Sequence, residues 1–117
     1  MQDDVESLVR SIQQLPVLTN ADNRALFERL WAGDESVRES IIDGNMHWVL
    51  EGARKVSEQR NLPLANAIAA GRDGLTKAVG KFSNPEFDFA PQDEATGYAF
   101  WWVQMAIFKL TQGQEPE

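Results

Sequence analysis

The residues of this chain that could do chemistry are concentrated in residues 97–107, where Tyr98, Phe100, Trp101 and Trp102 fall within five positions. Successive residues of a helix point about 100° apart, so Trp101 and Trp102 cannot face the same way. If one of them lies at a rim, its exposed ring offers a stacking surface for a flat group such as a nucleobase. The pattern is equally typical of two Trp residues in a core or an interface, and the stretch alone leaves both interpretations open.

The remaining reactive residue types argue against an enzyme. The chain has no Cys and one His, which excludes thiolate chemistry and makes a His-based metal site an unexpected feature. We expect His47 to be a surface or half-buried helix residue. Residues 69–74 lack the preceding strand and the Lys-Ser/Thr pair of a phosphate-binding loop. No Ser-His-Asp set and no Glu-x-x-His constellation occurs. We therefore expect no catalytic residue, no metal and no cofactor.

The charge is unevenly distributed along the 117 residues. A net charge of −7 argues against a general nucleic-acid binder, which usually presents a basic face. Residues 54–81 nevertheless hold six bases and two acids, whereas residues 83–117 hold six acids and one base. A modest basic strip is thus expected within an acidic molecule.

The N-terminal residues predict a location. The first four residues, Met-Gln-Asp-Asp, are acidic and no apolar segment of the signal-peptide kind follows them. No apolar run approaches the length of a membrane span. A cytoplasmic protein is expected.

Apolar spacing predicts helices throughout and no strand. Thr19 is a candidate N-cap with Asp22 in the first turn, and Gly33 ends the helix that follows. Phe87 and Phe89 are expected to pin a loop over 83–93 to the body of the protein. These patterns predict an all-α bundle with short connections, with helices over 4–14, 20–32, 35–58 (with a break or bend at 43–44), 64–70, 72–82 and 94–111.

Several sequence motifs follow one another in a characteristic order. They are the turn at 15–19 with Gly-Asp at 33–34, Asn-Met-His-Trp-Val at 45–49, Asn-Leu-Pro-Leu at 61–64, Gly-Leu-Thr-Lys-Ala-Val-Gly-Lys-Phe at 74–82, and Tyr-Ala-Phe-Trp-Trp-Val at 98–103. In this the chain resembles bacterial primary-type RNA polymerase sigma factors of the sigma-70 family, over their regions 1.2 and 2. The resemblance implies a single domain over 1–117, with 1–33 like region 1.2, 34–112 like region 2 and 113–117 a frayed tail. The resemblance does not extend to the family's regions 3 and 4.

The resemblance implies two partners, the RNA polymerase core and promoter DNA. In the family, one helix of region 2 grips the coiled coil of the largest polymerase subunit, and aromatic residues capture a flipped adenine of the promoter −10 element. The candidate polymerase-binding residues are Asn66, Ala69, Ala70, Arg72 and Thr76. The candidate DNA-binding residues are Tyr98, Phe100, Trp101, Trp102, Gln104, Lys109, Arg54, Lys55 and Lys81, and Phe89 is the candidate for the family's adenine-pocket Phe.

The chain departs from the family at both surfaces. On the polymerase side, the family's Asp, Gln and Glu are Asn66, Ala69 and Ala70. On the DNA side, the family's Arg, Gln and Thr are Gln104, Met105 and Phe108, and the loop before the Trp pair is longer and acidic. Two hypotheses follow. The chain is a sigma-like transcription domain that binds polymerase or single-stranded −10 DNA, or it is a degenerate sigma-like module that binds proteins, as a sigma competitor or regulator, without binding DNA.

Overall fold

The computed structural model describes residues 2–84, 86–90 and 97–112 of the chain. The described part contains six α-helices, one short 3-10 helix and no strand, so the all-α fold class predicted from the sequence is confirmed. The expected tail over 113–117 and the first residues of the expected 94–111 helix lie outside the described residues. The elements are α1 (Gln2–Gln13), α2 (Asn20–Trp31), η1 (Glu35–Val37), α3 (Arg38–Gly44), α4 (Met46–Arg60), α5 (Leu64–Lys81) and α6 (Tyr98–Gln112).

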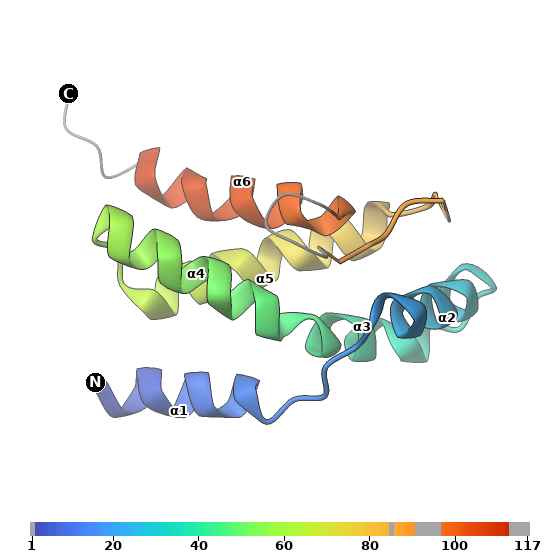
Figure 1. Cartoon of the computed structure of the whole chain (residues 1–117), viewed down its shortest axis with the longest axis horizontal. Coiled ribbons are helices and arrows are strands. Elements are labelled where there is room, and N and C mark those ends of the chain that lie inside the picture. Colours follow the sequence, from blue (N-terminus) through green and yellow to red (C-terminus); the bar gives the residue numbers. More distant parts are fainter. Residues whose placement is uncertain (1, 85, 91–96, 113–117) are drawn as a thin grey trace.

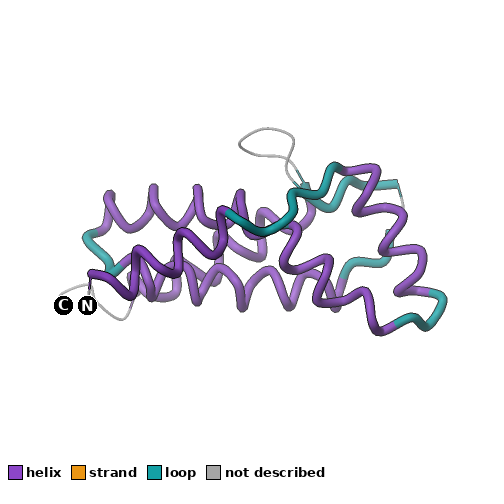
Figure 2. Tube along the Cα trace, turned by 90° about the horizontal axis from the view of Figure 1, so that it is seen from below, coloured by secondary structure: helices purple, strands orange, loops and turns teal. Residues whose placement is uncertain are grey.

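An antiparallel pair, α4 and α5, forms the centre of the bundle (Figure 1). Helix α6 returns along α5 on one side, and α1 packs on the other side of the pair. Helices α2 and α3, with η1 between them, gather at the end of the molecule where α4 begins and α5 ends. Figure 2 shows the same helices from below, joined by short loops. Because α6 begins where α5 ends, its aromatic first turns lie at that end too.

The helix boundary signals read from the sequence at Thr19 and Gly33 are confirmed. The Thr19 Oγ1 accepts a hydrogen bond from the Asp22 backbone N–H (3.1 Å), and the Asp22 Oδ2 accepts one from the Thr19 N–H (3.0 Å), which forms a reciprocal capping box at the start of α2. Gly33 has φ 108°, a conformation open to glycine, and ends the helix. Asn61 adopts the left-handed conformation with φ 57° and ends α4.

The predicted split of residues 64–82 at Gly71 is wrong, because α5 continues through it as one helix. The glycines allow close packing here rather than ending the helix. A Cβ atom at Gly74 would lie 2.6 Å from the Trp102 carbonyl oxygen, and one at Gly71 would lie 2.7 Å from the Val49 side chain. Both α4 and α6 therefore approach α5 more closely than a residue with a side chain would permit.

The break allowed at 43–44 is present, since α3 ends at Gly44 and α4 begins at Met46. Gly44 is itself a close-approach site, because a Cβ atom there would collide with the Leu18 side chain. The backbone N–H of Leu18 also donates to the Gly44 carbonyl oxygen (3.0 Å). This contact holds the segment between α1 and α2 against the junction of α3 and α4.

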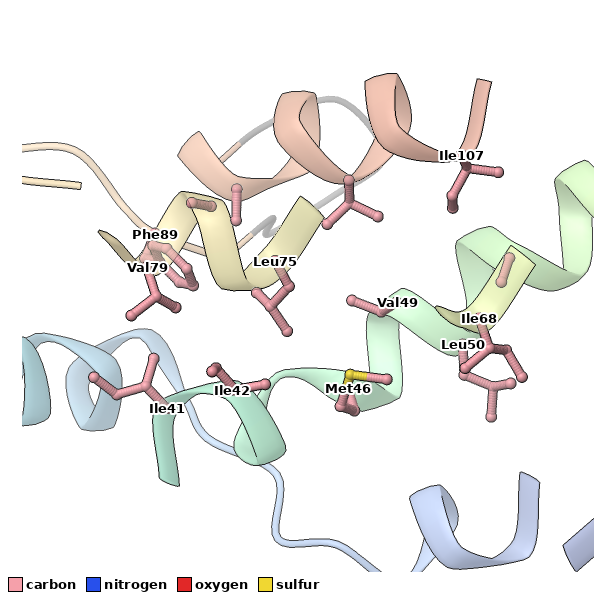
Figure 3. Packing of buried hydrophobic residues seen from close by; sticks show 14 of the residues in the cluster. Ile41, Ile42, Met46, Val49, Leu50, Ile68, Leu75, Val79, Phe89 and Ile107 are labelled. Carbon is pink, nitrogen blue, oxygen red and sulfur yellow. The ribbon is translucent and has the colours of Figure 1, made fainter. Parts of the chain in front are cut away.

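The hydrophobic core lies where α3, α4, α5 and α6 meet (Figure 3). Side chains from far-apart segments converge there, and those with under 2% of their surface exposed include Phe27, Ile41, Leu75, Val49 and Ile107. Fully burying a side chain of this size stabilises the fold by about 1.5–3 kcal/mol. The core therefore fixes α6 on α5 and sets which residues of α6 face outward.

A polar pair lies inside this core. Asn45 Nδ2 donates to the Asn23 Oδ1 (2.8 Å) and to the Ile41 carbonyl oxygen (2.7 Å), while the Asn45 Oδ1 accepts from Asn23 Nδ2 (3.3 Å) and from the Trp48 indole N–H (3.0 Å). Both Asn residues are almost fully buried. Buried amides need such partners, so the pair fixes α2 against the junction of α3 and α4.

Candidate nucleic-acid interface

The start of α6 is attached to the preceding segment by its backbone. The N–H groups of Tyr98 and Ala99 donate to the carbonyl oxygens of Asp88 and Phe89, each at 2.9 Å. The first N–H groups of a helix have no partner within the helix, and these two find theirs in the preceding segment. The aromatic residues of the first turns of α6 are thereby held on a fixed support.

The two Trp side chains divide as the helical spacing predicts. Trp101 is 59% exposed, whereas Trp102 is half-buried and packs against the core. Their rings meet edge to face, with centroids 5.3 Å apart and an interplanar angle of 88°. An exposed indole supported by a second indole is a suitable surface for stacking a flat group.

Behind this pair, aromatic rings continue into the core. Tyr98 is half-buried and lies between Trp102 (6.4 Å between centroids) and Phe82 (5.1 Å). Phe82 contacts Phe89 (5.3 Å), which contacts Phe27 of α2 (4.7 Å). Such aromatic pairs are worth about 0.5–1.5 kcal/mol beyond their buried area. The series connects α2 to α6.

The two Phe residues of the segment before α6 differ in burial. Phe89 is pinned to the body as predicted, with 2% of its surface exposed. As the candidate adenine-pocket residue it is therefore covered by its neighbours in this conformation. The expectation that Phe87 is also pinned is wrong, since Phe87 is 61% exposed. The difference lies in the packing, because the Phe89 ring contacts the rings of Phe27 and Phe82 and Phe87 lies at the surface.

The other candidate DNA-binding residues are spread over three helices. Phe100 and Gln104 are half-buried on α6, and Lys109 is exposed near the end of that helix. Arg54 is half-buried and Lys55 exposed on α4, and Lys81 is the exposed last residue of α5. Lys81 therefore shares an end of the bundle with the Trp pair, while Lys109 lies towards the opposite end. The predicted basic strip is not one compact patch beside Trp101.

Sequence reasoning missed two residues of this face as site candidates. Met105 is 41% exposed one turn after Trp101. The Arg60 guanidinium carbon lies 5.7 Å from the centroid of the Phe108 ring, a cation–π arrangement between the end of α4 and α6. The i+4 and i+7 spacing from Trp101 could have identified Met105 and Phe108, but no local signal links Arg60 to them.

The candidate polymerase-binding residues lie on α5. Asn66, Ala69 and Thr76 are exposed, and Ala70 is half-buried. The Thr76 hydroxyl donates to the Arg72 carbonyl oxygen within the helix (2.9 Å). This face thus offers few long polar side chains to a partner.

Arg72, the remaining candidate, is half-buried and joins α5 to α3. Its guanidinium nitrogens lie 3.1 Å from a Glu39 carboxylate oxygen and 3.3 Å from an Asp43 oxygen. All three side chains are about two-fifths exposed or more, so each ion pair contributes at most about 1 kcal/mol. The two pairs direct the guanidinium towards α3 rather than towards solvent.

His47 is half-buried near the start of α4, as expected. Burial is the main reason that the pKa of His47 lies below its usual value, and it outweighs the opposite effects of the Gly44 backbone and the Glu51 carboxylate. Among the residues that the structure describes, no three His, Asp or Glu side chains come together as a metal site would require. No helix in the described ranges is both long and apolar enough to cross a membrane.

Comparison with known proteins finds relatives among RNA polymerase sigma factors, although no protein-family model matches the chain. The chain is 30% identical over 113 residues to the RNA polymerase sigma factor SigA of a Bacillus species, which is 96% of this chain and 28% of that protein. It is 30% identical over 112 residues to SigA of Clostridium acetobutylicum, with the same coverage. It is also 30% identical to the sigma factor RpoS of Coxiella burnetii, over 96% of this chain and 30% of that protein. The chain spans less than a third of the length of these relatives.

Proposed function

We propose, from the premise that this chain belongs to the sigma-70 family and is a region 2-like domain of it, that the protein captures single-stranded promoter DNA of the −10 type on Trp101. The similarity to SigA and RpoS supports a role as a sigma-70-like transcription initiation domain. The role is one of binding rather than catalysis. Because bacterial RNA polymerase works in the cytoplasm, the proposal includes the cytoplasmic location expected from the sequence.

The observation that carries the proposal is the exposed indole of Trp101. The Trp101 side chain is 59% exposed, and its ring rests against the half-buried ring of Trp102. Helix α6, which carries both, is held on α5 through the close contact at Gly74. Stacking a base on such a ring is worth about 1–3 kcal/mol. Lys81 lies at the same end of the bundle and can neutralise a phosphate of the bound strand.

The test is a titration of a labelled single-stranded −10 oligonucleotide, read by fluorescence anisotropy at low salt. We expect Trp101→Ala to weaken binding about tenfold or more, because one stacking contact is lost. Phe87→Ala is the matched control, since Phe87 is exposed to a similar degree (61%) outside α6. Unchanged affinity of the Trp101 variant, or an equal loss in both variants, contradicts the proposal.

A second candidate function is favoured by the surroundings of Arg72. The guanidinium is engaged by Glu39 and Asp43 of α3, and short side chains, Ala69 and Ala70, stand where the family has Gln and Glu. Charge-assisted interface hydrogen bonds are worth about 1.5–3 kcal/mol each, so their loss weakens the polymerase contact strongly. The chain would then act as a sigma-like module that binds proteins other than the polymerase core.

Co-purification with core RNA polymerase separates the two candidates. If the second is correct, the wild-type chain is not retained, and the double variant Ala69→Gln/Ala70→Glu gains binding. If the wild-type chain is retained on core RNA polymerase at a stoichiometric level, the loss of the Gln and Glu side chains at positions 69 and 70 does not abolish polymerase binding. That result favours a sigma-like role in transcription initiation.

A further inference from the structure

Helix α1 joins the rest of the fold through one row of apolar side chains. The row repeats at helical spacing and consists of Val5, Leu8, Val9 and Ile12. Among residues 5–13, Ile12 alone is buried, with 5% of its surface exposed. Leu8 and Val9 pack against the core and remain half-buried. The contact of α1 with the bundle is therefore narrow.

The helices that α1 covers are packed far more extensively. Buried residues extend through most of α4, from Met46 to Val56, and through most of α5, from Ala67 to Val79. In Figure 1, α1 lies along one side of this pair and α6 along the other. Figure 3 shows Leu50 on the side of α4 towards α1. Helix α1 thus adds one buried side chain to a core that the other helices largely build.

The length of α1 gives it little helical stability of its own. The helix has 12 residues. Isolated helices shorter than about 12–15 residues are marginal in water, because few hydrogen bonds offset the cost of the first turn. The helical form of α1 therefore depends on its contact with α4 and α5. Loss of that contact and unwinding of the helix are expected to occur as one event.

The segment after α1 contains both a hinge and an anchor. Residues 15–19 form no helix, Pro16 has no N–H to donate, and Val17 is 60% exposed. Leu18 is held in contrast, since its N–H donates to the Gly44 carbonyl oxygen (3.0 Å) and its side chain fills the space beside Gly44. Residues before Leu18 can therefore leave the bundle while Leu18 and the helices after it stay in place.

We propose that α1 is a strap that opens and closes over α4 and α5 while the rest of the fold stays intact. The structure shows the closed state. In the open state, residues 5–13 unwind and leave the bundle, the chain bends at 15–17, and Leu18 remains on Gly44. Opening uncovers the apolar side of α4 and α5, so the strap controls access to it. Because α6 lies on the opposite side of this pair, the strap does not depend on base capture by Trp101.

The first experiment is amide hydrogen exchange of the full wild-type chain, followed by NMR at several urea concentrations below the unfolding transition. We expect the amides of residues 6–13 to exchange at least about a hundredfold faster than the buried amides of α4 and α5, at rates that urea hardly changes, as in a local opening. The Leu18 amide should be protected like those of α4. Equal protection of α1 and α5, or exchange of Leu18 together with α1, overturns the proposal.

The second experiment measures the opening with a single thiol, since the chain has no Cys of its own. Ile12→Cys and Ile107→Cys are matched variants, because both Ile residues are buried (5% and 1% exposed) and lie on the first and last described helices. After each rate is corrected for the stability of the variant in urea unfolding, we expect Ile12→Cys to react with a thiol reagent at least about tenfold faster. Equal corrected rates contradict the strap, because they mean that α1 opens no more readily than α6.

A third comparison separates the strap from base capture. Ile12→Ala should speed the exchange of α1 about tenfold or more, because it removes the one buried side chain of residues 5–13, and should leave affinity for the −10 oligonucleotide unchanged. Val17→Ala is the matched control and should change neither quantity, since Val17 is exposed. An equal loss of oligonucleotide affinity in Ile12→Ala and Trp101→Ala contradicts an independent strap. Fast exchange of α1 in a chain that does not bind the oligonucleotide sinks base capture and supports the strap.

Discussion

Gly74 is a position at which one added methyl group would meet the backbone of α6. A Cβ atom there would lie 2.6 Å from the Trp102 carbonyl oxygen and 2.9 Å from the Val103 Cα, both backbone atoms of α6. Ordinary van der Waals contact begins near 3.4 Å, so Gly74→Ala must move α6 by about 0.8 Å. A displacement of that size loses a quarter to a half of each dispersion contact it opens.

The expected change is a net destabilisation of up to about 2 kcal/mol. Forcing a methyl group into a packed interface costs about 1–3 kcal/mol, and replacing Gly by Ala in a helix returns about 1 kcal/mol of that. Gly52→Ala is the matched control, because Gly52 lies within α4 and a Cβ atom there would meet nothing within 4 Å. That variant should gain up to about 1 kcal/mol.

The assay is urea unfolding followed by circular dichroism, which measures the free energy of unfolding of both variants and the wild type. The reasoning predicts that the two Gly→Ala changes have opposite signs. If Gly74→Ala is as stable as Gly52→Ala, the close approach of α5 and α6 is wrong, and with it the orientation of the Trp pair.

Three further predictions follow from single contacts. Asn45→Ala should destabilise the fold by about 1–3 kcal/mol, because it leaves the buried amide of Asn23 without its partner; urea unfolding measures this. The folded-state pKa of His47 lies below its ordinary value of 6.5, so the unfolded chain takes up the proton first. Thermal stability should therefore fall as the pH drops below about 6.5. The variant His47→Gln should show a smaller fall when its melting temperatures above and below this pH are compared with those of the wild type. Arg72→Asn should lower stability by at most about 2 kcal/mol, because it removes two exposed ion pairs of at most about 1 kcal/mol each; a larger loss would mean that the guanidinium supports α3 in some additional way.

The fold was predictable largely because its signals are local. The capping box at Thr19 and the end of α2 at Gly33 involve residues within one turn of the helix end, and apolar spacing located most of the helices. A helix end was wrongly predicted at Gly71, because the role of this glycine is to admit Val49 and α6, which are far away in the sequence. A glycine that ends a helix and one that admits a neighbouring helix look the same without knowledge of that neighbour.

The candidate site was predictable only in part. Helical spacing separates Trp101 from Trp102, and the structure confirms that separation. Phe87 and Phe89 occur in one aromatic segment, and only the packing around Phe27 distinguishes the buried ring from the exposed one. The contacts of Arg72 with α3 also join residues about thirty positions apart, which no spacing rule connects.

The most direct test of the central claim follows the indole N–H resonances of the four Trp residues by NMR during titration with a single-stranded −10 oligonucleotide. The indole N–H groups of Trp31 and Trp48 are held by the Phe82 carbonyl oxygen (3.1 Å) and the Asn45 side chain (3.0 Å). If a base stacks on α6, we expect the indole N–H resonance of Trp101 to shift most and that of Trp102 to shift less. The resonances of Trp31 and Trp48 should not shift. Shifts confined to Trp31, or no shift of Trp101 at saturating oligonucleotide, would contradict base capture on α6.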